Sequence, residues 1–253
     1  MFNRRDIIYL YDGSFEGLLT AVFESFSFHE IPMNILVNSN VQETLDMNYY
    51  YVNTDTEKAY RVQKSITQKI SRYTMHNIFF TYLSVCSDKE MKILAYIHRC
   101  FKYGKSVNSR INDKYVGAVC DAALSVGNEA HKLKGFIRFL ELSNGVYYGK
   151  ISPKARILPA LILHFKERFN SMPFIIHDLT HEECLVYNGK SAEIYKTDTI
   201  PKLDISDNEE HYKALWREFY NTVAIKERHN PKCQMNNMPK RYWQHLTEME
   251  LVN

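Results

Sequence analysis

Residues 135–148 of the chain read Gly-Phe-Ile-Arg-Phe-Leu-Glu-Leu-Ser-Asn-Gly-Val-Tyr-Tyr. Up to Leu142 the pattern changes from a helical period towards the alternating period of a β-strand, with Arg138 in phase with Phe136 and Leu140. Asn144 and Gly145 then supply the positive φ angles that a tight turn requires, and an apolar run resumes at Val146. The stretch predicts a β-hairpin, and it marks the point where helical patterns give way to strand patterns.

The residues that follow extend this hairpin into a sheet. A helical pattern covers about residues 157–169, and three short strand-like runs come after it, at 174–177, 183–187 and 192–195. Asn188 and Gly189 join the last two runs as a second tight turn. The order of strand, strand, helix and three strands predicts an antiparallel sheet with one helix packed across it.

The residues before the hairpin are mainly helical in pattern. An apolar run at 7–11 ends at Asp12 and Gly13, which predicts one buried strand. Asp12 or Ser14 can cap the helix that follows at about 15–26. Further helical patterns cover about 56–82, 87–103 and 112–126, and one more surrounds Trp216.

These patterns together predict an α+β protein. We expect a helical N-terminal half with one starting strand, an antiparallel sheet crossed by a helix, and a helical C-terminal arm. A chain of 253 residues fits one large domain or two ordinary ones. We predict a single compact domain over 1–253, with a mainly helical subregion at 1–130, the sheet and its helix at 131–200, and the arm at 207–253.

The composition is that of a globular protein, with 45% apolar and 24% charged residues. The five cysteines are scattered and form no Cys-x-x-Cys pair, so we expect neither a metal nor a bound cofactor. With no signal-like segment and no apolar run near the length of a membrane span, we expect a cytoplasmic protein that has no membrane partner.

Positive charge is concentrated in two parts of a chain whose net charge is +3. The first lies between His131 and Met172, and the second between Lys226 and His245, with an acidic stretch between them. Lys134, Arg138 and Arg228 are our candidates there for phosphate contacts, because lysine and arginine neutralise phosphates. If the strand face that carries Arg138 is buried, its guanidinium must instead meet a carboxylate, a ligand phosphate or the rim.

The final segment, residues 238–243, combines cations with large aromatic rings. Lys240 and Arg241 could contact phosphates, while the rings of Tyr242 and Trp243 could stack on unpaired bases. The alternative is a C-terminal element whose Tyr242 and Trp243 fill the core while the cations stay in water. The sequence leaves both interpretations open.

Catalytic chemistry has only weak candidates, namely His177, Asp178 and Asp12. His177 and Asp178 belong to a stretch rich in acid-base side chains, but a polar turn between two strands accounts for it better than a metal site. Asp12 ends the first strand, where phosphate sites form in other proteins, yet the stretch lacks the glycines and lysine of a P-loop. No serine hydrolase, dinucleotide-binding or zinc deaminase pattern occurs.

Several separated blocks of the sequence resemble one bacterial family. The blocks are Tyr11–Gly17, His131–Phe139, Phe174–Asp178, Asn230–Pro231 and Met238–Trp243. Together they resemble an uncharacterised family of DNA metabolism and repair proteins, whose members lie beside a radical-SAM protein or are fused to a uracil-DNA-glycosylase-like domain. The resemblance implies a role in DNA repair or base modification and assigns no catalytic residue.

The expected function is therefore to bind DNA for a partner enzyme. We predict an accessory protein that presents DNA to a radical-SAM or glycosylase-type enzyme. One alternative is a free-standing enzyme of nuclease or glycosylase type that uses His177, Asp178 or Asp12. A second alternative is a protein-interaction scaffold whose basic arm binds an acidic partner.

Overall fold

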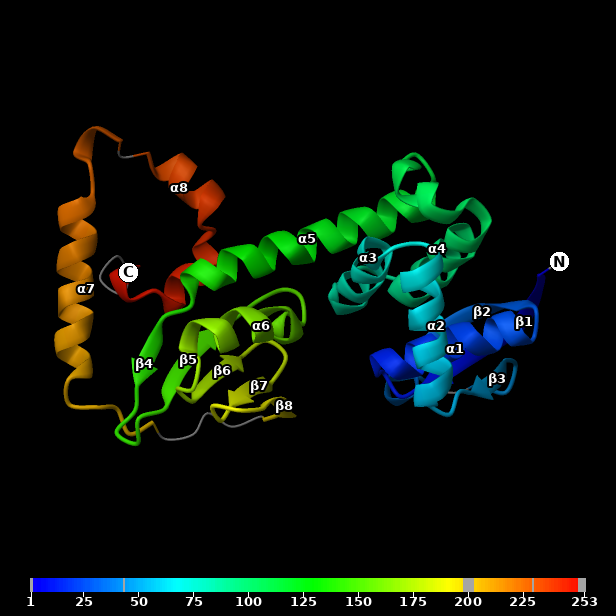
Figure 1. Ribbon diagram of the computed structural model, residues 1–253, viewed down its shortest axis with the longest axis horizontal. Coiled ribbons are helices and arrows are strands. Elements are labelled where there is room, and N and C mark those ends of the chain that lie inside the picture. Colours follow the sequence, from blue (N-terminus) through cyan, green and yellow to red (C-terminus); the bar gives the residue numbers. More distant parts are fainter. Residues whose placement is uncertain (1, 43, 198–202, 229, 250–253) are drawn as a thin grey trace. The chain divides into compact units, whose positions relative to one another are not determined.

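The computed structural model describes residues 2–42, 44–197, 203–228 and 230–249 (Figure 1). It confirms the predicted α+β class. Contacts between residues divide the chain into two compact units, Met1–Gly127 and Asn128–Asn253, and each is described by itself. The expectation of one compact domain over the whole chain stays a prediction.

The first unit contains a small parallel sheet. Its strands are β1 (Asn3–Tyr11), β2 (Glu30–Val37) and β3 (Asn48–Tyr51), in the order β2-β1-β3. The sequence predicted β1 alone. The other two strands were missed because Pro32 and Asn34 interrupt the apolar pattern of β2, and β3 is a short tyrosine-rich run.

Four helices and the start of a fifth complete this unit. They are α1 (Phe15–Ser27), α2 (Thr56–Lys69), α3 (Arg72–Leu83), α4 (Lys89–Tyr103) and α5 (Lys114–Phe136), with short 3-10 turns at Asn38–Asn40 and Gly104–Ser109. Ser14 caps α1 by accepting from the backbone N–H of Gly17, as predicted. The helix expected at 56–82 is two helices, because Ser71 accepts from the N–H of Thr74 and starts α3 anew.

The second unit is built on a five-stranded sheet. The strands are β4 (Phe139–Glu141), β5 (Tyr147–Ile151), β6 (Phe174–Asp178), β7 (Glu183–Tyr187) and β8 (Ala192–Lys196), in chain order across the sheet. The strand and helix order is the predicted one. The sheet is mixed, however, because α6 (Leu158–Phe169) carries the chain back across it and leaves β5 and β6 parallel.

Helix α5 is longer than the sequence predicted. It continues to Phe136, so the first hairpin strand is confined to Phe139–Glu141, and Lys134 lies in the helix rather than ahead of a strand. Helix α6 covers one face of the sheet (Figure 1), where Leu161 and Phe165 pack with Ile176 of β6. This layer forms the core of the second unit.

The C-terminal part is helical, as predicted. It consists of α7 (Glu209–Val223), α8 (Pro231–Asn237) and three short 3-10 turns, η3 (Lys226–Arg228), η4 (Lys240–His245) and η5 (Thr247–Met249). Turn η4 returns to the core, because Tyr242 packs there with Leu133 of α5. In the described part of the chain, every helix is too short or too polar to span a bilayer.

Candidate nucleic-acid interface

Arg241 and Tyr242 are anchored on one buried carboxylate. Glu129 of α5 is 6% exposed, and its Oε1 accepts from Arg241 Nη2 at 2.9 Å and from the Tyr242 hydroxyl at 3.0 Å. The same carboxylate accepts from the backbone N–H groups of Lys154 and Ala155, each at 3.0 Å. Burial raises the pKa of the Tyr242 hydroxyl to about 12, so it stays protonated and donates to Glu129. This cluster joins α5, the segment after β5, and η4.

Arg138 has a comparable partner in η5, the turn that follows η4. Its guanidinium forms two hydrogen bonds with Glu248, with Nη2 to Oε1 at 2.6 Å and Nε to Oε2 at 3.2 Å. Trp216 of α7 donates its indole N–H to the same carboxylate at 2.9 Å, and its ring centroid lies 5.0 Å from the Arg138 guanidinium carbon. From the sequence we expected a carboxylate, a ligand phosphate or a rim position for the Arg138 guanidinium. The structure shows a carboxylate.

These contacts correct part of the predicted interface. The ring of Tyr242 is 2% exposed, so the expectation that it stacks on a base is wrong, and the core-filling alternative holds for it. Trp243 is half-buried and donates its indole N–H to the carbonyl of Met238 at 2.9 Å. Lys240 is exposed, with its ammonium 5.8 Å from the centre of the Trp243 ring. Lys240 and Trp243 therefore remain predicted contacts, whereas Arg138 and Arg241 already hold the fold together.

A groove of about 1050 Å³ lies in the arm. Its lining residues come from the end of α7, the connection that follows and α8, and Figure 1 shows the ribbon of these elements. Arg228, the third predicted arginine, lines this groove together with Tyr220. Its other polar lining consists of three amide side chains, those of Asn230, Gln234 and Asn237, and of one carboxylate, Glu227. No carboxylate among the described residues lies within ion-pairing distance of Arg228. The structure thus brings one predicted cation together with groups that sequence reasoning missed.

Local structure holds these side chains in place. Asn230 caps α8 by accepting from the backbone N–H of Cys233 at 3.0 Å. Gln234 reaches the Tyr220 hydroxyl at 3.4 Å and so links α8 to α7. The amide-rich run at 234–237 was visible in the sequence, but nothing there placed it opposite an aromatic ring.

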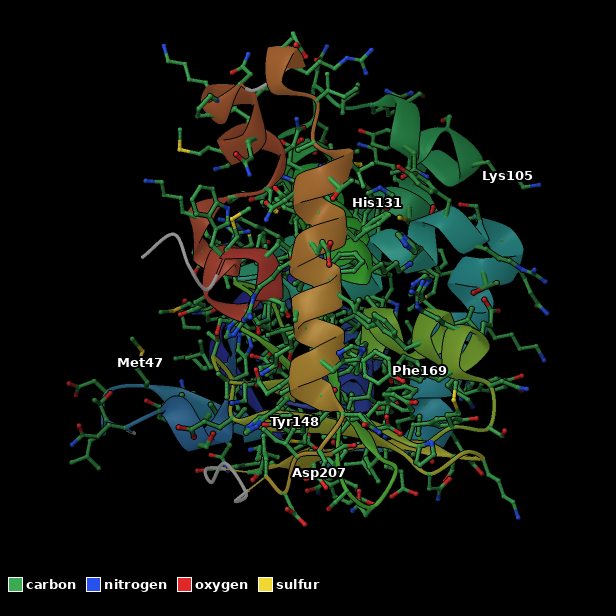
Figure 2. All side chains as sticks on the ribbon, turned by 90° about the vertical axis from the view of Figure 1, so that its left-hand side faces the viewer. Met47, Lys105, His131, Tyr148, Phe169 and Asp207 are labelled. Atoms are coloured by element: carbon green, nitrogen blue, oxygen red, sulfur yellow. The ribbon has the colours of Figure 1, made fainter. Side chains whose placement is uncertain are left out.

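Helix α7 presents apolar side chains to solvent. Figure 2 looks onto this helix, which rises from the labelled Asp207. Its large exposed side chains are Tyr212, Leu215, Trp216, Phe219, Tyr220 and Val223. The sequence pattern predicted the helix correctly, but helical spacing alone does not show whether the apolar face meets a core.

Lys134 belongs to a separate cationic cluster. It lies close enough to His164 of α6 for its charge to act on that imidazole, as does Arg168 one turn further along. Burial first, and then these two cations, lower the pKa of His164, and its Nε2 is buried without a partner in the described residues. The charge of Lys134 therefore acts on α6, and the described residues show no contact that Lys134 and Arg228 share.

The side chains of all three catalytic candidates form hydrogen bonds with neighbouring protein groups. His177 is 2% exposed and its Nδ1 lies 2.8 Å from the Tyr148 hydroxyl. Asp178 is fully buried and accepts from the backbone N–H groups of Thr180 and His181, which confirms the predicted polar turn. Among the residues that the structure describes, no group of three histidine, cysteine or acidic side chains is placed to hold a metal.

Asp12, in the first unit, ends β1 in the same manner. Its carboxylate accepts from the backbone N–H of Ser14 at 2.9 Å and from the hydroxyl of Thr54 at 2.8 Å. Partial burial opposes ionisation, but the hydrogen bonds from Ser14 and Thr54 outweigh it and lower the pKa of Asp12. Asp12 therefore stabilises the turn that starts α1.

Comparison with known families adds one match. A model of the domain family DUF4130, described as a domain of unknown function, matches residues 87–248. The chain belongs to this family. The DUF4130 region begins just before α4 and ends within η5, so it includes the Glu129 cluster, the Arg138 pair and the whole groove. No curated protein matches the sequence.

Proposed function

We propose that this DUF4130 protein binds DNA as an accessory factor in repair or base modification and presents it to a radical-SAM or glycosylase-type partner. The groove between α7 and α8 carries the proposal, because Tyr220 and Arg228 both line it. The sequence resemblance to DNA metabolism and repair proteins supports the choice of DNA and of these partners.

The chemistry of the groove suits an unpaired strand. An aromatic ring offers a face on which any base can stack, and a guanidinium pairs with a phosphate. The amides of Asn230, Gln234 and Asn237 add donors and acceptors for the edges of bases. In duplex DNA the base faces are hidden, so this combination favours single-stranded or locally opened DNA.

Binding is favoured over catalysis by the roles of the candidate acid-base groups. The carboxylates of Asp178 and Asp12 accept from neighbouring protein groups, and His177 is buried with its Nδ1 beside the Tyr148 hydroxyl. The groove lining, in contrast, includes an aromatic ring, a guanidinium and three amides that could contact a strand. The proposed division of labour leaves the chemical step to the partner enzyme.

A protein-interaction scaffold is the second candidate, and α7 is the observation that favours it. Tyr212, Leu215 and Phe219 are 56%, 47% and 58% exposed on this helix. An apolar helix face of this kind is typical of a surface that another protein covers. The two functions are compatible, because an accessory factor must also contact its enzyme.

Salt dependence of binding tests the proposal. The affinity for a fluorescent single-stranded oligonucleotide, measured by anisotropy, should fall steeply as salt is raised, because phosphate contacts release counterions. Arg228→Gln should lower the log–log salt slope by about 1. Lys190→Gln is the matched control, because Lys190 is exposed in the turn between β7 and β8 and does not line the groove. An affinity independent of salt, or equal slopes for both variants, would contradict the proposal.

A further inference from the structure

Strand β5 carries a row of polar side chains on the sheet face opposite α6. Ile151 points into the core beneath α6, so the alternation of the strand places Tyr148 and Lys150 on the other face. Lys150 lies directly beside His177 in the parallel register of β5 and β6. Ser152 follows the strand, and its hydroxyl lies 2.9 Å from Nε2 of His245 in η4.

The row contains a cation without a counter-charge. Lys150 is half-buried, and no carboxylate among the described residues lies within ion-pairing distance of its ammonium. Its charge nevertheless reaches two imidazoles. Burial first, and then Lys150, lower the pKa of His177, with Asp178 acting weakly in the opposite direction. Burial and then Lys150 likewise lower the pKa of His245.

Two hydroxyl groups orient these neutral imidazoles. Burial raises the pKa of Tyr148 to about 12, so the phenol keeps its proton and can donate to Nδ1 of His177 at 2.8 Å. His177 then carries its own proton on Nε2. If Ser152 donates to Nε2 of His245 in the same way, the proton of that ring lies on Nδ1. In these tautomers the N–H atoms are Nε2 of His177 and Nδ1 of His245, and both rings lie close enough to Lys150 for its charge to act on them.

We infer that Lys150, His177 and His245, with the hydroxyls of Tyr148 and Ser152 behind them, form a binding site for a phosphate group. A phosphate would supply the missing negative charge to Lys150 and accept from the imidazole N–H groups. Lys150 and His245 are half-buried, and His177 is 2% exposed. The inference does not rest on the groove, because none of these residues lines it.

The ligand is a phosphate group, which could arrive as free phosphate or as the terminal phosphate of a strand. Titration with inorganic phosphate, followed through the side-chain resonances of His177 and His245 by NMR, tests binding directly. Both resonances should shift saturably, and the pKa of each imidazole should rise when phosphate is bound, because a dianion stabilises imidazolium. A 5′-phosphorylated oligonucleotide that binds more tightly than its 5′-hydroxyl twin would identify the strand end as the source.

Substitution of the cation separates this site from the groove. Lys150→Gln should weaken phosphate binding at least tenfold and, without phosphate, raise the pKa of both imidazoles, because the neighbouring positive charge is gone. Lys150→Arg should retain binding, and Lys190→Gln should behave as the parent. The oligonucleotide affinity of the groove should respond to Arg228→Gln whether or not phosphate binds. Histidine resonances of the unsubstituted protein that ignore millimolar phosphate, or full binding by Lys150→Gln, would overturn the inference.

Discussion

Arg241 and Arg228 belong to the same basic segment of the chain, yet they have opposite surroundings. Arg241 pairs with Glu129, a carboxylate that is 6% exposed and also fixes Tyr242 in the core. Arg228 lines an open groove beside Tyr220, with no described carboxylate near enough to pair with it. One arginine and its tyrosine hold the fold, whereas the other pair is available to a ligand.

The difference shows that a basic residue near an aromatic residue in the sequence can have either of two positions, one paired in the core and one open to solvent. Where a buried carboxylate lies within reach, the ring becomes core and the cation neutralises the carboxylate. Where none does, as at Arg228, the guanidinium has no ion pair among the described residues and lines the groove. Arg138 likewise pairs with a carboxylate, Glu248, 110 positions away in sequence, although the Trp216 ring beside it stays 38% exposed. Substitutions on the two sides should therefore separate stability from binding.

Truncation of Tyr242 should have the largest effect. Tyr242→Ala removes a fully buried ring, so we expect the free energy of unfolding to fall by about 3–5 kcal/mol. Tyr242→Phe keeps the ring and loses only the hydroxyl bonds, at a cost of about 1 kcal/mol. Urea denaturation followed by circular dichroism measures both. A Tyr242→Ala protein of unchanged stability that had lost DNA affinity would reverse the roles we assign.

Loss of the buried carboxylate should have the next largest effect. Glu129→Gln retains one carbonyl oxygen but leaves the backbone N–H of Ala155 or the guanidinium of Arg241 without its acceptor. We expect a loss of about 1–3 kcal/mol in the free energy of unfolding. Thermal unfolding of this variant beside Glu227→Gln, an exposed glutamate that lines the groove, gives the comparison. Equal stability of the two variants would disprove the anchoring role of Glu129.

Substitution of Tyr220 tests binding in the groove that contains Arg228. Tyr220→Leu removes the stacking face and should weaken single-stranded DNA binding by about 1–3 kcal/mol. The folded state should lose little, because Tyr220 is 36% exposed. Tyr220→Phe keeps the ring and should retain most of the affinity in the same anisotropy assay. An affinity unchanged by Tyr220→Leu would exclude stacking at this position.

The smallest expected effect is a pH dependence of stability at Glu248. Burial alone would raise the pKa of this carboxyl, but hydrogen bonds from Arg138 and Trp216 outweigh it and lower the pKa below its ordinary value. The stabilisation is therefore complete above the ordinary pKa and is lost as the pH falls through the lower value of the folded state. Unfolding midpoints of the parent and Glu248→Gln should differ at neutral pH and converge in acid. Parallel curves would show that Glu248 is not stabilised by Arg138.

Local patterns predicted most of the fold. The hairpin turn at Asn144, the helix at 157–169 and the strands that follow were readable because each depends on residues close in sequence. The parallel pairing of β5 and β6 was not, since it depends on the path of α6 across the sheet. Strands β2 and β3 were missed because their neighbours, rather than their own periodicity, make them strands.

The candidate site was predictable in residue type but not in arrangement. The sequence correctly indicated that Arg228 lies in a basic segment, and it gave Tyr242 two possible fates. The choice between those fates depends on Glu129, which is 113 positions away from Tyr242. Likewise, the position of Tyr220 in the groove depends on α8, whose Gln234 side chain lies 3.4 Å from the Tyr220 hydroxyl. Contacts between distant residues decide which cations are free.

The most direct test of this account measures both stability and single-stranded DNA affinity for Arg228→Gln and Arg241→Gln. We predict that Arg228→Gln lowers the salt dependence and affinity of binding while the unfolding midpoint stays at that of the parent. Arg241→Gln should lower the unfolding midpoint, while the folded protein keeps its affinity. A folded Arg241→Gln protein that had lost binding, together with an Arg228→Gln protein that bound normally, would contradict the central claim.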